Sequence, residues 1–278
     1  MKYNPKPLVP VNPEGLDDIA RSLLEDKTEI PESNISPSTN TSKPENYIIL
    51  PSKSHGSYSY PDMLVGIHRL SYTPDVERAS KTLTLNIQNT ATEKDGSDYI
   101  GSINHAQALS LNKTLGNITL DIRRFVDFLN LLKSQNVYDG NGTKLSQERT
   151  NAVLDEILTV RTPYRAEWLD ARFSEQNKQL RINYHKIKPD GNMQETTETL
   201  ETCLMKDKQI DLDDWLRRAT LHGLPPADVK SGTLYYWAPR NGRTAGFGAD
   251  SGRAYLDWYV DPAYSDARFG VRGAKIKR

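Results

Sequence analysis

The sequence has little of several features that would place a protein in a class at once. One cysteine, Cys203, occurs among 278 residues, which excludes an internal disulfide and a zinc or iron–sulfur site built on several cysteines. No apolar run approaches the roughly 20 residues that span a bilayer, and the first residues contain no apolar signal core. Lys plus Arg and Asp plus Glu both number 36, so the basic excess of a general nucleic-acid binder is missing. We therefore expect no nucleic-acid partner, no membrane span, and a location in the cytoplasm or on a virion.

Motifs for catalysis and cofactor binding are missing as well. The five histidines are scattered without an HExxH pair, and the sequence has no Walker loop, Rossmann glycine pattern or nucleophile elbow. Residues 139–143 begin like a calcium loop but lack its sixth-position glycine and its twelfth-position glutamate, which predicts a loop tip. Cys203 is expected to be a small buried residue, and His222 to end a helix. We predict no catalytic residue, no metal and no cofactor.

The N-terminal part differs in composition from the rest. Residues 1–45 hold seven of the 16 prolines, and residues 31–44 are so rich in Ser, Thr, Asn and Pro that they cannot bury enough apolar surface to be well ordered. Within this part, residues 15–26 have the apolar spacing of one amphipathic helix, which either docks on a partner or packs on its own domain. We predict an N-terminal helix with a linker over 1–45 and a globular domain over 46–278.

The globular domain is predicted to be α+β, because helical patterns come first and strands come last. Apolar alternation predicts strands over 47–50, 81–88 and 179–187. Apolar spacing of three and four predicts helices over 119–134 with Asp121 in the first turn, over 146–160 with Ser146 as N-cap, and over 211–222. A turn is expected over 139–142, and from Thr233 onward short aromatic strands with glycine turns take over.

The C-terminal segment has an unusual composition. Residues 233–278 contain nine of the 23 aromatic residues, and residues 233–274 contain no Glu, Lys, Gln, Met or His. Tyr, Trp, Arg, Gly, Ser, Asn and Asp remain, which is close to the residue set of antibody-type binding surfaces. The composition favours a recognition surface, while a glycine- and aromatic-rich sheet that only packs is the alternative.

Specific stretches of this segment resemble a known family. Tyr235-Tyr-Trp-Ala-Pro-Arg240, Arg253-Ala254, Asp261-Pro262 with Ser265, and Phe269-Gly-Val-Arg272 resemble the end of a C-type-lectin-like fold. The version that is most similar belongs to the variable proteins of diversity-generating retroelements, of archaeal and viral type and related to phage tropism determinants. This resemblance implies a C-type-lectin-like fold in its formylglycine-generating-enzyme-like variant, with helical insertions.

The resemblance also implies a function. In that family a reverse transcriptase misincorporates at template adenines, and the altered copy replaces the 3′ end of the gene, so that surface residues come to recognise varied ligands. Adenine-rich codons of the AAY type cannot become Lys, Glu, Gln, Met or Trp, and the absence of Lys, Glu, Gln and Met from 233–274 agrees with this. Trp237 and Trp258 would then be fixed scaffold positions or stand at codons of another type. The implied ligand is a protein or a cell-surface molecule that the sequence does not identify, with a variable region over about 240–270.

Strand alternation then assigns residues to two faces of the final strands. The inward face is expected to hold seven residues: Trp237, Phe247, Ala249, Ala254, Leu256, Val271 and Ala274. The outward, variable face, which is the candidate ligand-binding site, is expected to hold thirteen: Gly242, Arg243, Thr244, Gly246, Gly248, Asp250, Gly252, Tyr255, Asp257, Tyr259, Tyr264, Asp266 and Arg268.

Two other functions remain open on the same fold. The Gly-Val-Arg ending is shared with enzymes of the formylglycine-generating type, which need paired cysteines or iron-binding histidines that the single Cys203 and the dispersed histidines do not supply. A calcium-dependent sugar-binding lectin is the second alternative, although the Glu-Pro-Asn or Gln-Pro-Asp tripeptide of such lectins is absent.

Overall fold

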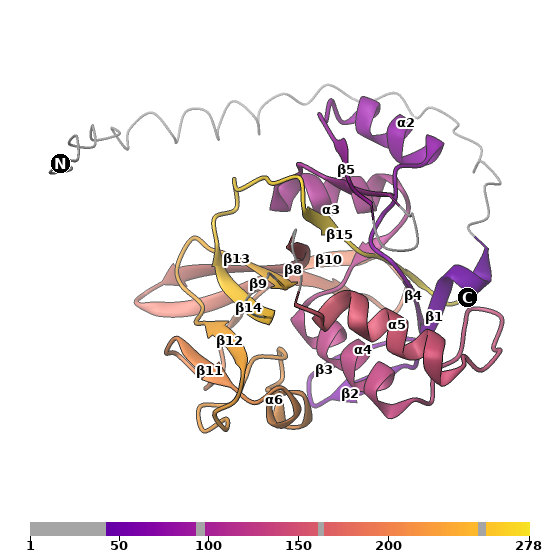
Figure 1. Ribbon diagram of the computed structural model, residues 1–278. Coiled ribbons are helices and arrows are strands. Elements are labelled where there is room, and N and C mark those ends of the chain that lie inside the picture. The colour runs from indigo at the N-terminus through magenta and orange to yellow at the C-terminus, as the bar shows by residue number, and fades with distance from the viewer. Residues whose placement is uncertain (1–42, 93–97, 161–163, 250–253) are drawn as a thin grey trace, which may run out of the picture. The chain divides into compact units, whose positions relative to one another are not determined.

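The computed structural model describes residues 43–92, 98–160, 164–249 and 254–278 (Figure 1). The chain divides into two units, residues 1–41 and 42–278, and every described residue belongs to the second. The helix expected over 15–26 therefore lies outside the described residues, as does the linker up to residue 42. No helix within the described ranges is both long and apolar enough to cross a membrane.

The described domain is mixed α and β, as the order of helical and strand patterns predicts. Its helices are η2 (Pro44–Asn46), α2 (Pro74–Thr82), α3 (His105–Thr114), α4 (Ile122–Ser134), α5 (Gln147–Leu158) and α6 (Leu212–Arg218). Its first strands are β1 (Tyr47–Leu50), β2 (Lys53–His55), β3 (Tyr58–Tyr60), β4 (Met63–Gly66), β5 (Gln88–Thr92), β6 (Asp98–Gly101), β7 (Ile118–Thr119) and β8 (Arg165–Gln176). The later strands are β9 (Gln179–Ile187), β10 (Met193–Thr199), β11 (Lys208–Ile210), β12 (Leu234–Trp237), β13 (Thr244–Ala249), β14 (Ala254–Val260), β15 (Phe269–Val271) and β16 (Gly273–Ile276).

One large sheet organises the domain. Its strand order is β10-β9-β8-β13-β14-β12-β11, and β15 pairs with β8 in addition. A four-stranded sheet, β1-β4-β16-β7, joins the first described strand to the last, and β2-β3 and β5-β6 form separate two-stranded sheets. Because β12 pairs in parallel with β14, and β15 in parallel with β8, the C-terminal strands are interleaved with earlier ones and do not form a simple meander.

Two hydrophobic clusters lie against opposite faces of the large sheet. The first cluster joins α4 and α5 to β13 and β14, and includes the rings of Phe125 and Phe247, whose centroids are 5.2 Å apart. The second joins α2 and α3 to β8 and β15, and includes Trp168 and Phe269 at 4.1 Å. In Figure 1 the α4–α5 pair and the α2–α3 pair accordingly lie apart, with the strands β8 and β15 between them. The sheet is therefore covered by apolar groups from both sides in its centre.

Several local patterns are confirmed. The strand over 47–50 and the strand over 179–187 are β1 and β9. The helix expected over 119–134 is α4, which begins at Ile122 because Asp121 is its N-cap and accepts a hydrogen bond from the Arg124 amide. Ser146 caps α5 in the same way. The turn over 139–142 is also present, held by the Asp139 carboxylate, which accepts hydrogen bonds from two backbone amides of the loop.

The strand predicted over 81–88 was wrong. Helix α2 occupies the first part of this stretch, because the Thr73 side chain caps it and Pro74 stands at its first turn. Thr84 then takes a left-handed backbone conformation at φ 53°, and the apolar residues of the stretch pack partly buried on the second cluster. A strong helix start upstream outweighs three alternating apolar residues.

The helix predicted over 211–222 is shorter than expected. It begins after the N-cap Asp211 but ends at Arg218, so His222 lies beyond it and not at its end. Gly223 follows with φ +90° and lies against α4, where a Cβ atom would stand 2.7 Å from the Arg123 nitrogen. At this close approach the chain that follows the helix is buried, and Leu224 packs in the first cluster.

Candidate functional site

The faces of β12 and β14 are set by their parallel register. Tyr235 pairs with Tyr255 and Trp237 with Asp257, so these four side chains point to one face of the sheet. Between them, Tyr236 and Leu256 point to the other face and are 1% and 0% exposed in the first cluster. The expectation that Trp237 points inward was therefore wrong: its neighbour Tyr236 takes the buried place, and Trp237 is half-buried on the opposite face.

A bulge in β14 extends this face toward β15. Gly246 pairs with Asp257 and Thr244 with Val260, so two residues of β14 oppose the single residue between Thr244 and Gly246. The extra residue shifts the alternation by one and brings Val260 to the face that Tyr255 and Asp257 occupy. Thr244, expected to point outward, is fully buried, and its hydroxyl donates to the Val260 carbonyl at 3.1 Å.

Gly246 and Gly248 lie on the predicted face but are buried, which corrects the expectation that they are exposed. Phe247 between them points into the first cluster, so the alternation itself is as predicted. The rings of the site cover the two glycines: a Cβ atom on Gly246 would lie 2.7 Å from Phe269 Cζ, and one on Gly248 would lie 2.6 Å from Tyr255 Cζ. Both positions form a floor on which a side chain would have to displace one of these rings.

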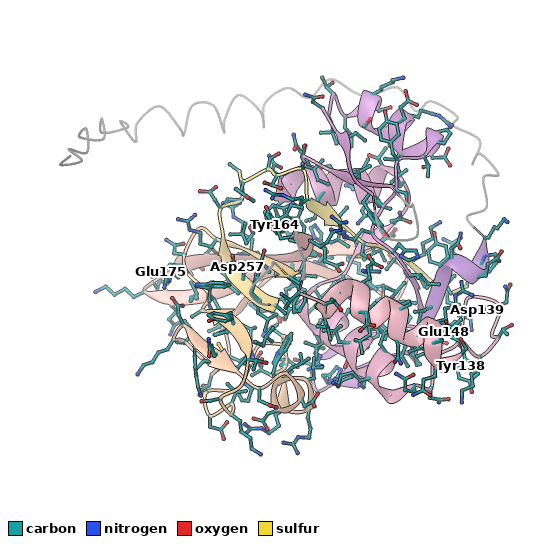
Figure 2. The ribbon with its side chains drawn as sticks, viewed as in Figure 1. Tyr138, Asp139, Glu148, Tyr164, Glu175 and Asp257 are labelled. Atoms are coloured by element: carbon teal, nitrogen blue, oxygen red, sulfur yellow. The ribbon has the colours of Figure 1, made fainter. Side chains whose placement is uncertain are left out.

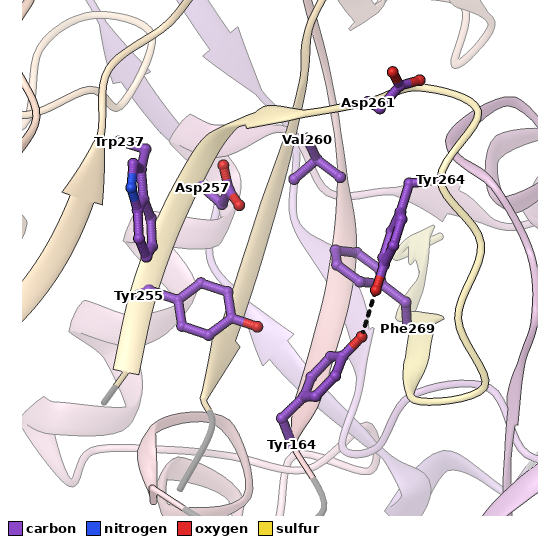
Figure 3. A pocket seen from close by; sticks show the side chains of 8 residues that line it. All are labelled: Tyr164, Trp237, Tyr255, Asp257, Val260, Asp261, Tyr264 and Phe269. Atoms are coloured by element: carbon purple, nitrogen blue, oxygen red, sulfur yellow. Dashed lines mark hydrogen bonds between the residues drawn. The ribbon is translucent and has the colours of Figure 1, made fainter. Parts of the chain in front are cut away.

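Above this floor is a pocket of about 400 Å³ (Figure 3). Its lining residues come from five places in the chain: Tyr164, Trp237, Tyr255, Asp257, Val260, Asp261, Tyr264 and Phe269. In Figure 3, Trp237 and Tyr255 stand on one side, and Tyr164, Tyr264 and Phe269 on the other. Neighbouring rings meet at steep angles, 79° between Trp237 and Tyr255 and 82° between Tyr264 and Phe269. We call this the aromatic pocket.

One wall of the aromatic pocket is held by hydrogen bonds. The hydroxyl groups of Tyr164 and Tyr264 are 2.9 Å apart and share a hydrogen bond. Arg268 places its guanidinium 4.1 Å above the Tyr164 ring and donates two hydrogen bonds of 2.7 Å to Asp266. These bonds lower the pKa of Asp266 to about 2, so the carboxylate is charged at neutral pH.

The remaining residues that were expected on the outward face lie in different places. Gly242 is exposed at φ +74° in the turn before β13, with open space around it. Arg243 is half-buried and donates to Asp261, which lines the aromatic pocket, at 3.1 Å. Asp250 and Gly252 lie outside the described residues, as does the side chain of Tyr259. The structure thus brings Tyr255, Asp257 and Tyr264 into one pocket, with Asp266, Arg268 and Arg243 beside it.

Of the seven residues expected to point inward, six do so. Phe247, Ala249, Leu256, Val271 and Ala274 are at most 1% exposed, and Ala254 packs partly buried on the first cluster. The pocket residues that the outward set missed are Tyr164, Trp237, Val260, Asp261 and Phe269. The C-terminal motifs contained Asp261 and Phe269, but no local pattern pointed to Tyr164, which β8 brings in from about 70 residues before Trp237.

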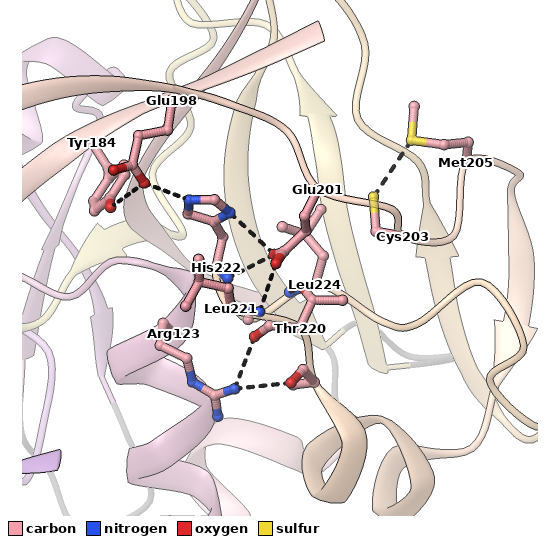
Figure 4. A network of polar contacts seen from close by, with 12 residues as sticks. Arg123, Tyr184, Glu198, Glu201, Cys203, Met205, Thr220, Leu221, His222 and Leu224 are labelled. Carbon is pink, nitrogen blue, oxygen red and sulfur yellow. Dashed lines mark hydrogen bonds and ion pairs between the residues drawn. The ribbon is translucent and has the colours of Figure 1, made fainter. Parts of the chain in front are cut away.

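A second polar cluster surrounds His222 (Figure 4). The imidazole is 4% exposed, and its two nitrogens lie 2.7 Å from Glu198 and 3.1 Å from Glu201. Tyr184 also donates to Glu198, at 2.9 Å. Burial lowers the pKa of His222, but the hydrogen bonds to Glu201 and Glu198 outweigh burial, so the pKa is raised. His222 is therefore a partner of two carboxylates, which corrects the expected helix-end role.

This cluster predicts a stability optimum in mildly acidic solution. A raised folded-state pKa means that the contribution of His222 is complete below its unfolded pKa of about 6.5 and is lost as pH rises through the folded value. The pKa of Glu198 moves the other way, from 4.5 to about 2: burial opposes the shift, and hydrogen bonds from Lys186, His222 and Tyr184 produce it. Its contribution is present above about pH 4.5 and is lost as pH falls toward 2.

Urea unfolding of the wild type and of His222→Gln from pH 5 to 8 measures this effect. We expect the stability difference between the two proteins to shrink as pH rises above about 6.5, because only the wild type loses a proton from this site. The hydrogen bond to Asp170 also raises the pKa of His185, so His185→Gln is expected to show the same trend and serves as a positive control for the method. A difference that stays constant from pH 5 to 8 would contradict the assignment.

Cys203 is buried, as expected. Burial, followed by the nearby Glu201 carboxylate, raises the pKa of its thiol to about 12, so the thiol is protonated at neutral pH. Its sulfur lies 3.5 Å from the Met205 sulfur.

Within the described ranges, no group of three or more His, Cys, Asp or Glu residues is placed to hold a metal ion.

Comparisons with protein families, with curated proteins and with solved structures gave no match to this chain.

Proposed function

We propose that this chain is a ligand-binding display protein with a C-type-lectin-like fold, whose C-terminal surface residues are diversified by a retroelement reverse transcriptase. In this proposal the aromatic pocket is the ligand-binding site, and its ligand is a protein or a cell-surface molecule bound without covalent chemistry or cofactor. The observation that carries the proposal is the separation of adjacent residues of β14. Tyr255 and Asp257 line the pocket, while Leu256 between them is completely buried in the first cluster.

This separation provides what a diversified surface requires. A side chain in the pocket wall can be exchanged without opening a cavity in the first cluster, because its neighbours Phe247 and Leu256 keep the strands in place from the other face. Exposed changes usually alter stability by less than about 0.5 kcal/mol, whereas truncation of a buried Leu or Phe costs about 2–5 kcal/mol. Variation would therefore accumulate on one face.

The geometry also narrows the set of positions proposed to vary. Gly246 and Thr244 are removed from it, because a Cβ atom on Gly246 would meet the Phe269 ring and Thr244 is buried with its hydroxyl bonded. Gly248 is removed as long as a tyrosine stands at position 255, since that ring is what its Cβ atom would meet. The described positions that remain are Gly242, Arg243, Tyr255, Asp257, Tyr264, Asp266 and Arg268.

The DNA that flanks the coding sequence tests this proposal. We expect a near-copy of the codons for about 240–270 close to a reverse-transcriptase gene, with differences from the coding copy at template adenines. The differences should fall on the codons of the seven positions named above and of Asp250, Gly252 and Tyr259, and the codons of Phe247, Leu256 and Val271 should be identical in both copies. A complete genome without such a copy would refute the proposal.

A further inference from the structure

The two glycines in the floor of the aromatic pocket are covered by rings that are held in different ways. Above Gly246 stands Phe269, which is 4% exposed and packs in the second cluster, with its ring centroid 4.1 Å from that of Trp168. Above Gly248 stands Tyr255, which is partly buried and belongs to neither hydrophobic cluster of the described domain. The ring over Gly246 is therefore fixed by the core, whereas the ring over Gly248 belongs to the pocket wall.

Gly248 and Tyr255 compete for one space. They stand directly opposite each other in the antiparallel pair of β13 and β14, so side chains at the two positions share one face. The three heavy atoms nearest to a Cβ atom on Gly248 would all belong to Tyr255, with Cζ at 2.6 Å, the hydroxyl oxygen at 2.7 Å and Cε2 at 2.8 Å. Gly248 is not among the glycines with positive φ, so its backbone accepts other residues. The residue at position 255 is therefore what keeps position 248 a glycine.

The order of the strands decides what each position does in the pocket. Tyr255 rises from β14 and contacts Trp237, with ring centroids 5.6 Å apart, and in Figure 3 its hydroxyl points away from Trp237. Strand β13 lies between β14 and β8, and Tyr164 stands directly before β8. A side chain at position 248 would therefore rise about 4.8 Å closer to the Tyr164 wall. It would narrow the pocket there and leave it wider beside Trp237.

We infer that positions 248 and 255 form one specificity-determining pair. A large side chain at 255 requires glycine at 248, and a side chain at 248 requires a small residue at 255. This inference deepens the proposed function and rests on it for its role, because a diversified surface could then change between two pocket shapes by exchanging two residues. Position 246 is not part of the pair, since the core residue Phe269 covers it.

Urea unfolding of the full chain with Gly248→Ala, with Tyr255→Ala and with both changes tests the pair. Alanine favours a strand backbone more than glycine does, so Gly248→Ala should raise the urea midpoint when the Tyr255 ring is absent. With the ring present it should lower the midpoint, and the two effects should differ by about 0.3–1 M urea. Gly246→Ala is the matched control: Phe269 stands in its way in both backgrounds, so it should lower the midpoint equally with and without Tyr255.

The place of the ring is measured separately by NMR of protein with isotope-labelled tyrosine rings. The Tyr255 resonance is identified by its disappearance in Tyr255→Phe. Gly248→Ala should shift this resonance, because the new Cβ atom displaces the ring, and Gly246→Ala should leave it in place. The ring of Tyr138, exposed on another part of the molecule (Figure 2), should keep its resonance in every variant.

An exchange of the two residues tests the second pocket shape. The double variant Gly248→Tyr with Tyr255→Gly should be folded by circular dichroism, and its urea midpoint should be higher than that of Gly248→Tyr alone, in which two rings would occupy one space. If Gly248→Tyr alone does not fold, recovery of the fold by Tyr255→Gly is the expected result.

The outcomes separate the inference from the proposed function. The pair would be overturned by equal effects of Gly248→Ala in the two backgrounds, by an unshifted Tyr255 resonance, or by a failure of Tyr255→Gly to restore Gly248→Tyr. A flanking copy of the coding end would in that case leave the display function standing. A coupled pair without any flanking copy would keep the two pocket shapes and refute the retroelement origin of the surface.

Discussion

Replacing Leu256 by alanine is expected to lower the free energy of unfolding by about 2–5 kcal/mol, because the side chain is completely buried. Its strand, β14, lies in the large sheet between the strands that hold Phe247 and Tyr236. Replacing its neighbour Asp257 by alanine is expected to change the free energy of unfolding by less than about 1 kcal/mol, since that side chain lines an open pocket. Urea denaturation followed by tryptophan fluorescence measures both.

The pair of variants has a built-in control. Both residues lie in one strand and are adjacent, so strand propensity and sequence position are nearly the same, and the face of the sheet is what differs. If Asp257→Ala destabilises the protein as much as Leu256→Ala, the pocket wall is as constrained as the core. In that case this surface could not tolerate diversification.

Replacing Arg272 by methionine is expected to lower the free energy of unfolding by about 3–5 kcal/mol, because a buried carboxylate would lose its counter-charge. Arg272 is 1% exposed, and its guanidinium contacts Glu167 through two nitrogens at 3.1 and 3.2 Å. It also donates to the carbonyl groups of Gly66 and Ile67, and lies 3.7 Å from Glu156. Arg272 thus ties β8 to the loop after β4, directly before the last strand.

Two further substitutions make this prediction specific. Arg272→Lys keeps the charge but loses the planar fork, so its effect should be intermediate. Arg268→Met, four residues earlier, removes an arginine whose side chain is 38% exposed, so the expected change in the free energy of unfolding is below about 1 kcal/mol. Thermal and urea unfolding of the three variants gives the order. Equal losses of unfolding free energy in Arg272→Met and Arg268→Met would show that the burial of the Arg272–Glu167 ion pair does not set the size of the effect.

Local patterns predicted those elements whose signals lie within a few residues of one another. Helices α4 and α5 were predicted from apolar spacing, from Asp121 near the start of the first and from the cap Ser146 of the second; in the structure both side chains accept from amides three residues away. The expected strand over 81–88 failed for a related reason. Its alternating residues were a weaker signal than the cap and proline that begin α2 several residues earlier.

Other features depended on pairing between distant strands. Alternation predicts that Tyr236 and Trp237 point to opposite faces, but the parallel register with β14 and the first cluster decide which of them is buried. Likewise, Gly246 and Gly248 are on the predicted face, yet the rings of Phe269 and Tyr255 cover them. Sequence alternation contains no information on what lies above a residue.

By itself the sequence determined the mixed α and β class, the charge balance, the Ser146 cap of α5, and a C-terminal segment with the composition of a binding surface. These properties follow from composition and from interactions between near neighbours. Only the tertiary structure decided that Tyr164 joins that segment, that a bulge turns Val260 into the pocket, and that His222 lies between two glutamates. Each of these depends on chain segments that meet only when β8, β10, β13 and β14 have found their partners, because a contact between distant residues is set by the packing of whole elements.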